Sequence, residues 1–227
     1  MPIIYAATTD NDIKTAISTS WSSTRGASTG TLGGASDTAD SWSAAAFKFS
    51  GRGADQYRVH RSFFHFDTSG ITGTLSVATL KLYFYNDAGN GNIIIVKSDA
   101  FTGGSDALVA GDFNNLDFTT VYSGEIDTTT TGLTSITLNA TALADIQNDN
   151  DFKFALVNYD HDYGNSAPTG ANNYVGVRFA NYSGTSSDPQ IDYTVVTGYA
   201  NNVLGVASGS IGKVTGVATA SIGKVIV

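Results

Sequence analysis

Thr79-Leu-Lys-Leu-Tyr-Phe-Tyr85 alternates without a break between purely apolar residues and residues that carry a polar group. Successive side chains of a β-strand point to opposite faces, so this stretch predicts a strand with one face in a core. Gln56 to Asp67 and Phe152 to Tyr159 alternate in a similar way, although the first changes phase near Ser62-Phe63, which predicts a β-bulge. The apolar positions of the three stretches form the predicted core: Phe64, Phe66, Leu80, Leu82, Phe84, Phe154 and Leu156.

The composition favours a chain with very little helix. Of the 20 acidic residues 19 are Asp, and Glu125 is the only Glu. Glu favours helices whereas Asp favours loops and turns, and the abundant Thr, Val, Tyr and Phe suit pleated strands. Ala140–Asn148 is the one segment that predicts a helix.

Further strands are predicted in the rest of residues 1–197. They cover residues 3–7, Asn92–Lys97, Thr134–Leu138, Tyr174–Asn181 and Gln190–Val196, whereas much of 18–45 is predicted as long loops with Trp21 and Trp42 as anchors. About ten strands separated by Gly, Asn, Asp and Ser turns predict an all-β fold. We expect residues 1–197 to form one antiparallel, jelly-roll-like β-sandwich.

Residues 198–227 form a short C-terminal repeat appendage. Val203 to Lys213 and Val214 to Lys224 are two copies of an 11-residue unit, and a third begins at Val225. A unit this short cannot bury an apolar face by itself, so its neighbours must come from other subunits or a larger assembly. We expect short strands that pair between subunits. The residues predicted to mediate oligomerisation or docking are Val206, Ile211, Val214, Val217, Ile222 and Val225.

The net charge excludes several classes of partner. A charge of −8 and a pI near 4.5 argue against binding to nucleic acid and to anionic membranes. The absence of Cys rules out disulfides and thiolate metal sites. The N-terminus lacks the basic and apolar regions of a signal peptide, and no stretch approaches about 20 apolar residues. We therefore expect a protein made in a host cytoplasm and not exported by a signal peptide.

Arg61-Ser-Phe-Phe-His-Phe-Asp67, followed by Ile71 and Ser76-Val-Ala-Thr-Leu-Lys-Leu-Tyr83, resembles the core signature of DNRLRE-type β-sandwich modules. The Ser/Gly-rich residues 20–45 and the closing Asp188-Pro-Gln-Ile-Asp-Tyr193 fit the outline of that family, whereas Val77 departs from it. Such modules resemble carbohydrate-binding jelly rolls of surface proteins. The Gly-Val-Ala-x-x-Ser-Ile-Gly-Lys repeat resembles the ends of phage structural proteins, which implies a virion component.

No catalytic set emerges from the sequence. Gly26-Ala-Ser28-Thr-Gly30 matches a nucleophile-elbow pattern, but both flanks are rich in Ser, Thr and Gly instead of forming a strand and a helix. His60 and His65 are expected on opposite faces of a strand, and His161 is expected in a loop. We therefore expect a protein that is not an enzyme and needs no organic cofactor.

Two kinds of ligand site remain open. Asp149, Asp151, Asp160 and Asp162 bracket the Phe152–Tyr159 strand with hard oxygen ligands, which suit a structural Ca²⁺, although solvated turn carboxylates are the favoured explanation. A second group of exposed aromatic and amide side chains suits contact with a glycan, or covers the rim of the sandwich. Its members are Tyr159, Tyr163, Asn172 and Tyr174.

Two functions follow from these features. The repeat and the missing leader favour a non-enzymatic phage virion structural protein: a capsid decoration, head fibre or tail appendage. Its partners would be further copies of the chain and other virion proteins, with host surface glycans as a further ligand. The body instead favours a carbohydrate-binding or adhesion module of a cell-surface protein.

Overall fold

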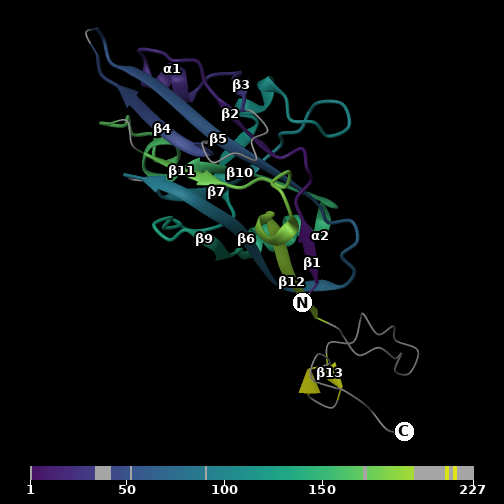
Figure 1. The fold of residues 1–227 in the computed structure, drawn as a ribbon. Helices are drawn as coiled ribbons and strands as arrows, with labels where there is room; N and C mark the ends of the chain where they lie inside the picture. The colour runs from purple at the N-terminus through teal and green to yellow at the C-terminus, as the bar shows by residue number, and fades with distance from the viewer. Residues whose placement is uncertain are drawn as a thin grey trace.

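The computed structural model describes residues 2–33, 42–51, 53–89, 91–170, 173–196, 213–214 and 217–218 (Figure 1). The strands are β1 (Ile3–Tyr5), β2 (Asn11–Lys14), β3 (Thr31–Leu32), β4 (Ala44–Phe49), β5 (Gln56–Asp67), β6 (Thr74–Ala88), β7 (Ile93–Ser98), β8 (Leu116–Val121), β9 (Gly132–Thr137), β10 (Asp151–Asn158), β11 (Tyr174–Val177), β12 (Gln190–Val196), β13 (Lys213–Val214) and β14 (Val217–Ala218). The helical segments are α1 (Trp21–Arg25), η1 (Ala110–Asn114), α2 (Ala140–Asn148), η2 (Tyr159–Tyr163) and η3 (Thr185–Ser187). The chain is therefore mostly β with few helices, as its composition predicts.

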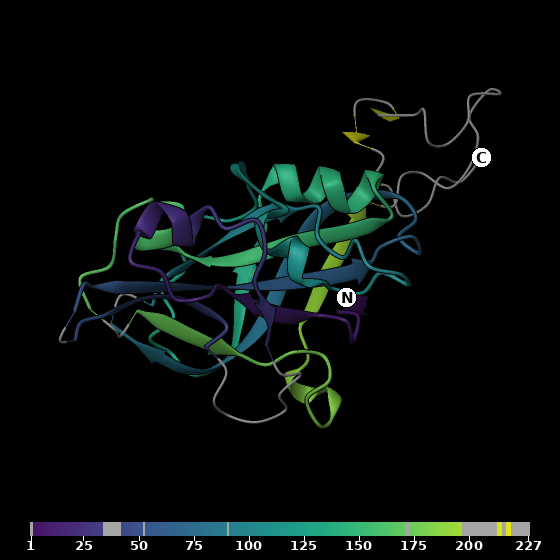
Figure 2. The same cartoon turned by 90° about the horizontal axis from the view of Figure 1, so that it is seen from above.

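Twelve strands form one antiparallel sheet, in the order β1-β12-β6-β11-β4-β5-β10-β7-β8, with β2, β3 and β9 attached at its sides. β11 and β12 follow one another along β6, and β9 also pairs with β6. β4 pairs with both β11 and β5, so it joins the two halves of the sheet. The sheet connects segments that lie far apart in the chain, as the crossing colours of Figure 2 show.

The predicted core residues lie together in one cluster, here called the inner core. All seven are at most 1% exposed, which confirms the interpretation of the three alternating stretches. The cluster combines β5, β7 and β10 with β6, β9, β11 and β12, so the two halves of the sheet share it. Rings stack within it: the centroid of Phe64 lies 5.0 Å from that of Phe154 and 5.4 Å from that of Phe179.

A second cluster lies on the other face of β5, β7 and β10, and we call it the outer core. It contains Ile13, Val59, Phe63, Ile94, Val96, Ala100, Phe101, Leu108, Phe113, Ala155 and Val157. These three strands are therefore buried on both faces. The predicted bulge at Ser62-Phe63 is wrong, because β5 pairs with its neighbours there without a change of register. The change of phase arises because every residue from Val59 to Phe66 is buried.

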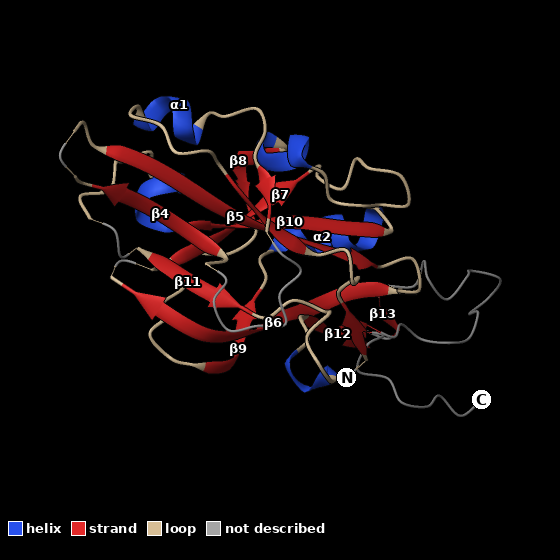
Figure 3. Cartoon of the chain, turned by 45° about the horizontal axis from the view of Figure 1, so that its top comes forward, coloured by secondary structure: helices blue, strands red, loops and turns tan. Residues whose placement is uncertain are grey.

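Helix α2 has the predicted bounds. Asn139 caps it by accepting a hydrogen bond from the Ala142 N–H at 3.0 Å, and Ala142 and Ile146 are its buried residues (Figure 3). The prediction of loops over 18–45 is incomplete, since α1, β3 and the start of β4 lie in that range. No helix among the described residues is long and apolar enough to cross a membrane.

The repeat segment, residues 198–227, contributes one small hairpin to the described structure. β13 and β14 pair antiparallel, with Val214 directly opposite Val217, and they form a sheet of their own. This pair lies within one copy of the chain, and strand pairing between subunits stays a prediction. Val206, Ile211, Ile222 and Val225 lie outside the described residues.

Leu82→Ala tests the inner core. Leu82 is fully buried on β6, so we expect its truncation to lower the free energy of unfolding by about 2–5 kcal/mol through the lost transfer energy and the cavity. Val77→Ala is the matched control, because Val77 is 45% exposed on the same strand and should change stability by less than about 0.5 kcal/mol. Equal losses in chemical denaturation would contradict this assignment.

Candidate functional site

Four aromatic rings meet around strand β4 and form what we call the aromatic cluster: Trp42, Phe47, His60 and Tyr174. The centroid of Trp42 lies 4.9 Å from that of Phe47 and 6.0 Å from that of Tyr174. Trp42 is 38% exposed, whereas Phe47 beneath it is 2% exposed. Trp42 thus presents an aromatic surface to solvent on a buried aromatic support, an arrangement suited to stacking against an apolar ligand face.

Strand pairing brings these side chains together. Ala45 of β4 lies opposite both Tyr174 of β11 and His60 of β5, and directly opposite residues project from the same face of a sheet. Phe47 follows two residues after Ala45 and therefore also lies on this face. Trp42 precedes β4 by two residues and covers the group from the loop side. The concentration of Trp42, Phe47 and Phe49 in and just before β4 was the signal that could have predicted this surface.

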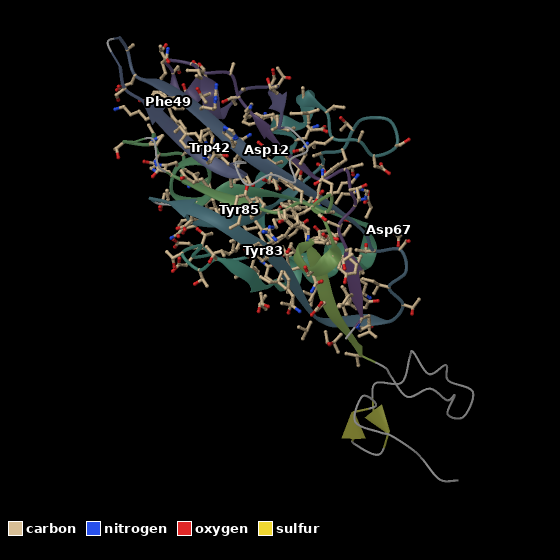
Figure 4. The ribbon with its side chains drawn as sticks, viewed as in Figure 1. Asp12, Trp42, Phe49, Asp67, Tyr83 and Tyr85 are labelled. Atoms are coloured by element: carbon tan, nitrogen blue, oxygen red, sulfur yellow. The ribbon has the colours of Figure 1, made fainter. Side chains whose placement is uncertain are left out.

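A cavity lies beside the aromatic cluster, at the turn between β4 and β5. Its volume is about 350 Å³, and Phe49 and Gln56 line it together with Thr19 and the turn residues. The centroid of Phe49 lies 5.8 Å from that of Phe47, so the cavity and the cluster are joined by aromatic contact. Figure 4 places Trp42 and Phe49 toward the end of the body where the β4–β5 hairpin extends.

His60 is the titratable member of the cluster. Its Nδ1 lies 3.3 Å from Asp12 Oδ2, and its Nε2 is buried without a hydrogen-bond partner. Burial lowers the pKa of His60, and the neighbouring Asp12 only partly opposes this effect. A neutral imidazole is therefore favoured in the folded protein. As predicted, His65 is on the other face of β5, where it contacts Phe101 of the outer core.

The described residues predicted for glycan contact belong to two elements, η2 and β11. Tyr159 and Tyr163 stack on each other in η2 with centroids 5.7 Å apart, and both pack against the outer core. Tyr174 instead belongs to the aromatic cluster, and Asn172 lies outside the described residues. Only Tyr174 of the described members therefore lies beside the exposed Trp42.

The predicted calcium ligands are divided between the two ends of β10. Asp149 and Asp151 line a polar cavity of about 340 Å³ with Lys97 and Lys153, whose ammonium groups pair with these carboxylates. Asp160 and Asp162 belong to η2. Among the described residues, no group of three or more His, Asp or Glu side chains is arranged to hold a metal. A calcium ion at these residues stays a prediction.

Asp162 has a different role, because it neutralises a buried arginine. Both its carboxylate oxygens accept hydrogen bonds from Arg61, at 2.7 and 2.8 Å, and neither residue is exposed. Arg61 also donates to the carbonyls of Phe113 and Arg25, each at 2.8 Å. The guanidinium lies 4.1 Å from the centroid of the Phe113 ring. This pair ties β5 to η2, η1 and α1.

The residues considered for catalysis do not assemble into a reactive group. Gly26 to Gly30 follow helix α1 and precede strand β3, which reverses the strand–helix order of a nucleophile elbow. In the polar cavity, the Tyr122 hydroxyl donates to Asp145. Burial and this carboxylate raise the pKa of Tyr122, so the phenol stays protonated.

No protein-family model matches the chain. No curated protein matches it either. The protein is thus classified by its fold alone, as a predominantly β domain built on a multi-strand antiparallel sheet.

Asp162→Ala tests the buried ion pair. We expect a loss of about 3–5 kcal/mol in the free energy of unfolding, because Arg61 would keep a buried charge without its partner. Asp160→Ala, in the same turn, should cost far less. Replacing both members of the pair by apolar side chains, Arg61→Met together with Asp162→Leu, should recover part of the loss, because the fully buried charge of Arg61 is removed, whereas the partly buried Arg25 still loses its ion pair with Asp162 at 3.5 Å. If Asp162→Ala is no worse than Asp160→Ala in urea denaturation, the pair is dispensable.

Proposed function

We propose that the protein is a non-enzymatic structural component of a phage virion, displayed as a capsid decoration, head fibre or tail appendage. The observation that carries this proposal is the hairpin formed by β13 and β14 within the repeat segment. Its strand residues, Lys213-Val214 and Val217-Ala218, span the junction of the two repeat copies. A repeat that can form a strand pair at each junction is suited to stacking on further copies.

The small size of this hairpin supports a role in assembly. Each of its strands has two residues, and an isolated two-stranded hairpin is marginally stable at best in water. Among the described residues no third strand pairs with this hairpin, and an unpaired strand edge offers N–H and C=O groups to another chain. We infer that the repeat segment gains stability by pairing with other copies of this chain or with another virion protein.

We also infer the finer architecture of the body. An inner core shared by the β5-β10-β7 half and the β6-β11-β12 half supports a jelly-roll-like β-sandwich, joined at one side through β4. The DNRLRE-type resemblance of residues 61–83 is in keeping with such a fold. In this proposal the sandwich is the displayed module, nucleic acid and membranes are not partners, and the virion is the site of action.

The aromatic cluster favours a second function, carbohydrate binding by a surface or adhesion module. Sugar rings have an apolar face that stacks on exposed aromatic side chains, and Trp42 and Tyr174 provide such a surface. The neighbouring cavity at Phe49 adds backbone and hydroxyl groups that can hydrogen-bond to a ligand. Both functions are compatible in one molecule, since a displayed virion module can contact a host glycan.

Removal of the repeat segment tests the assembly role. We expect the full chain to form oligomers in multi-angle light scattering and a chain ending at Thr197 to be a folded monomer, because the repeat would lose its partners. The full chain carrying Val214→Asp and Val217→Asp should behave like the truncated one, since two charges would face each other in the hairpin register. Identical oligomers from all three proteins would exclude this role.

Trp42→Ala tests glycan contact. On a glycan array we expect the intact chain to bind at least one glycan and the variant to lose about tenfold or more in affinity, because a central aromatic contact is removed. Tyr5→Ala is the control, since Tyr5 is 44% exposed and lies on β1 outside the cluster. We also expect the bound glycans to be recovered uncleaved. Equal affinity of both variants would rule out the aromatic cluster as the binding surface.

A further inference from the structure

Two loops meet on the side of the body where the chain begins. One joins β1 to β2 and the other joins β11 to β12, and they are hydrogen-bonded at two points. The Ala6 N–H donates to the Pro189 carbonyl at 2.9 Å. The Ala180 N–H donates to both carboxylate oxygens of Asp10, at 3.0 and 3.1 Å. In Figure 2 the yellow-green turn that contains η3 lies below the purple β1 segment, which is next to the N label.

Two carboxylates are buried where these loops meet. Asp10 is 2% exposed and Asp188 is 8% exposed. Burial raises the pKa of Asp10, and the Asp188 carboxylate raises it further. Neither carboxylate is within ion-pairing distance of a Lys, Arg or His among the described residues, although a buried carboxylate normally has such a partner.

Three oxygens of these two loops have no hydrogen-bond partner, and one of them belongs to the Asp188 carboxylate. They are Oδ1 of Asp188, Oδ1 of Asn181 and Oγ1 of Thr9, and all three atoms are buried. Asn181 directly follows Ala180, and Thr9 directly precedes Asp10, so these oxygens come from the same two loop segments. Buried polar atoms are paired in the great majority of cases, and a cation held between the two loops would give all three oxygens a partner.

We propose that Asp10 and Asp188, with Asn181 and Thr9, form a calcium site that joins the β1–β2 loop to the β11–β12 loop. Ca²⁺ takes carboxylate, amide, hydroxyl and backbone oxygens together and tolerates irregular geometry. Two carboxylates neutralise its charge, and the neutral oxygens gain the partner that they lack. The site contains no nitrogen or sulfur ligand of the kind that zinc prefers. It is distinct from the predicted ligands Asp149, Asp151, Asp160 and Asp162.

The ion would stabilise the fold where the two loops adjoin the inner core. Ala180 follows Phe179, whose ring stacks on Phe64 in the inner core. Pro189 precedes β12, which pairs with β1. A cation between the loops therefore fixes both the start of β12 and the position of Phe179. This inference does not rest on the proposed function, because it concerns the stability of the body.

Calcium titration of the chelator-stripped full chain tests this site. We expect a heat of binding in calorimetry and a rise in melting temperature of about 5–10 °C at a calcium concentration about 100 times Kd. Asp10→Asn and Asp188→Asn should each weaken calcium binding by at least about tenfold and remove most of the rise, because each loses a charged ligand. Asp127→Asn, which alters an exposed turn carboxylate, should respond as the unchanged chain does.

Circular dichroism of each variant after calcium removal shows whether it is folded. Because Asp10→Asn and Asp188→Asn are tested separately, the experiment remains informative if one of them does not fold. The proposal is overturned if calcium leaves the melting temperature of the unchanged chain where it was. It is also overturned if both Asp10→Asn and Asp188→Asn keep the full calcium response. In that case the ion binds elsewhere, and the same titration of Asp149→Asn with Asp151→Asn would locate it in the polar cavity.

Discussion

The buried ion pair between Arg61 and Asp162 is the contact on which the outer half of the body depends. A fully buried arginine is tolerable only when its charge is neutralised and its N–H groups are satisfied, and Asp162 with the carbonyls of Phe113 and Arg25 does both. Because these partners come from η2, η1 and α1, one side chain on β5 holds three separate covering segments over the sheet. Their apolar residues then complete the outer core.

The two cores limit where the body can offer a binding surface. β5, β7 and β10 are covered on both faces, so their middle residues have no surface to offer a ligand. Exposed aromatic and acidic groups are left where strands end and loops meet. The aromatic cluster lies at one such place, and the buried carboxylates Asp10 and Asp188 lie at another. Loops on a rigid sheet commonly carry binding residues for this reason.

The body and the repeat segment differ in how they obtain stability. The body buries its apolar residues within one chain, through long strands and two packed clusters. The hairpin of β13 and β14 is too short to bury apolar residues in this way. Among the described residues, its two strands pair only with each other. In the function that we propose, the self-sufficient domain is displayed and the repeat segment supplies the contacts for assembly.

The amino-acid sequence by itself determined the β class, the α2 helix and the inner core, because these follow from local periodicity and from the excess of Asp over Glu. Three features depended on the tertiary structure. β5 gave a false bulge signal, since burial on both faces removes the alternation on which such a prediction rests. Trp42 meets Tyr174 only through the pairing of β4 with β11, and Asp10 meets Ala180 only where two distant loops touch. Contacts between residues more than a hundred positions apart leave no periodic trace in the chain, so only the folded sheet decides them.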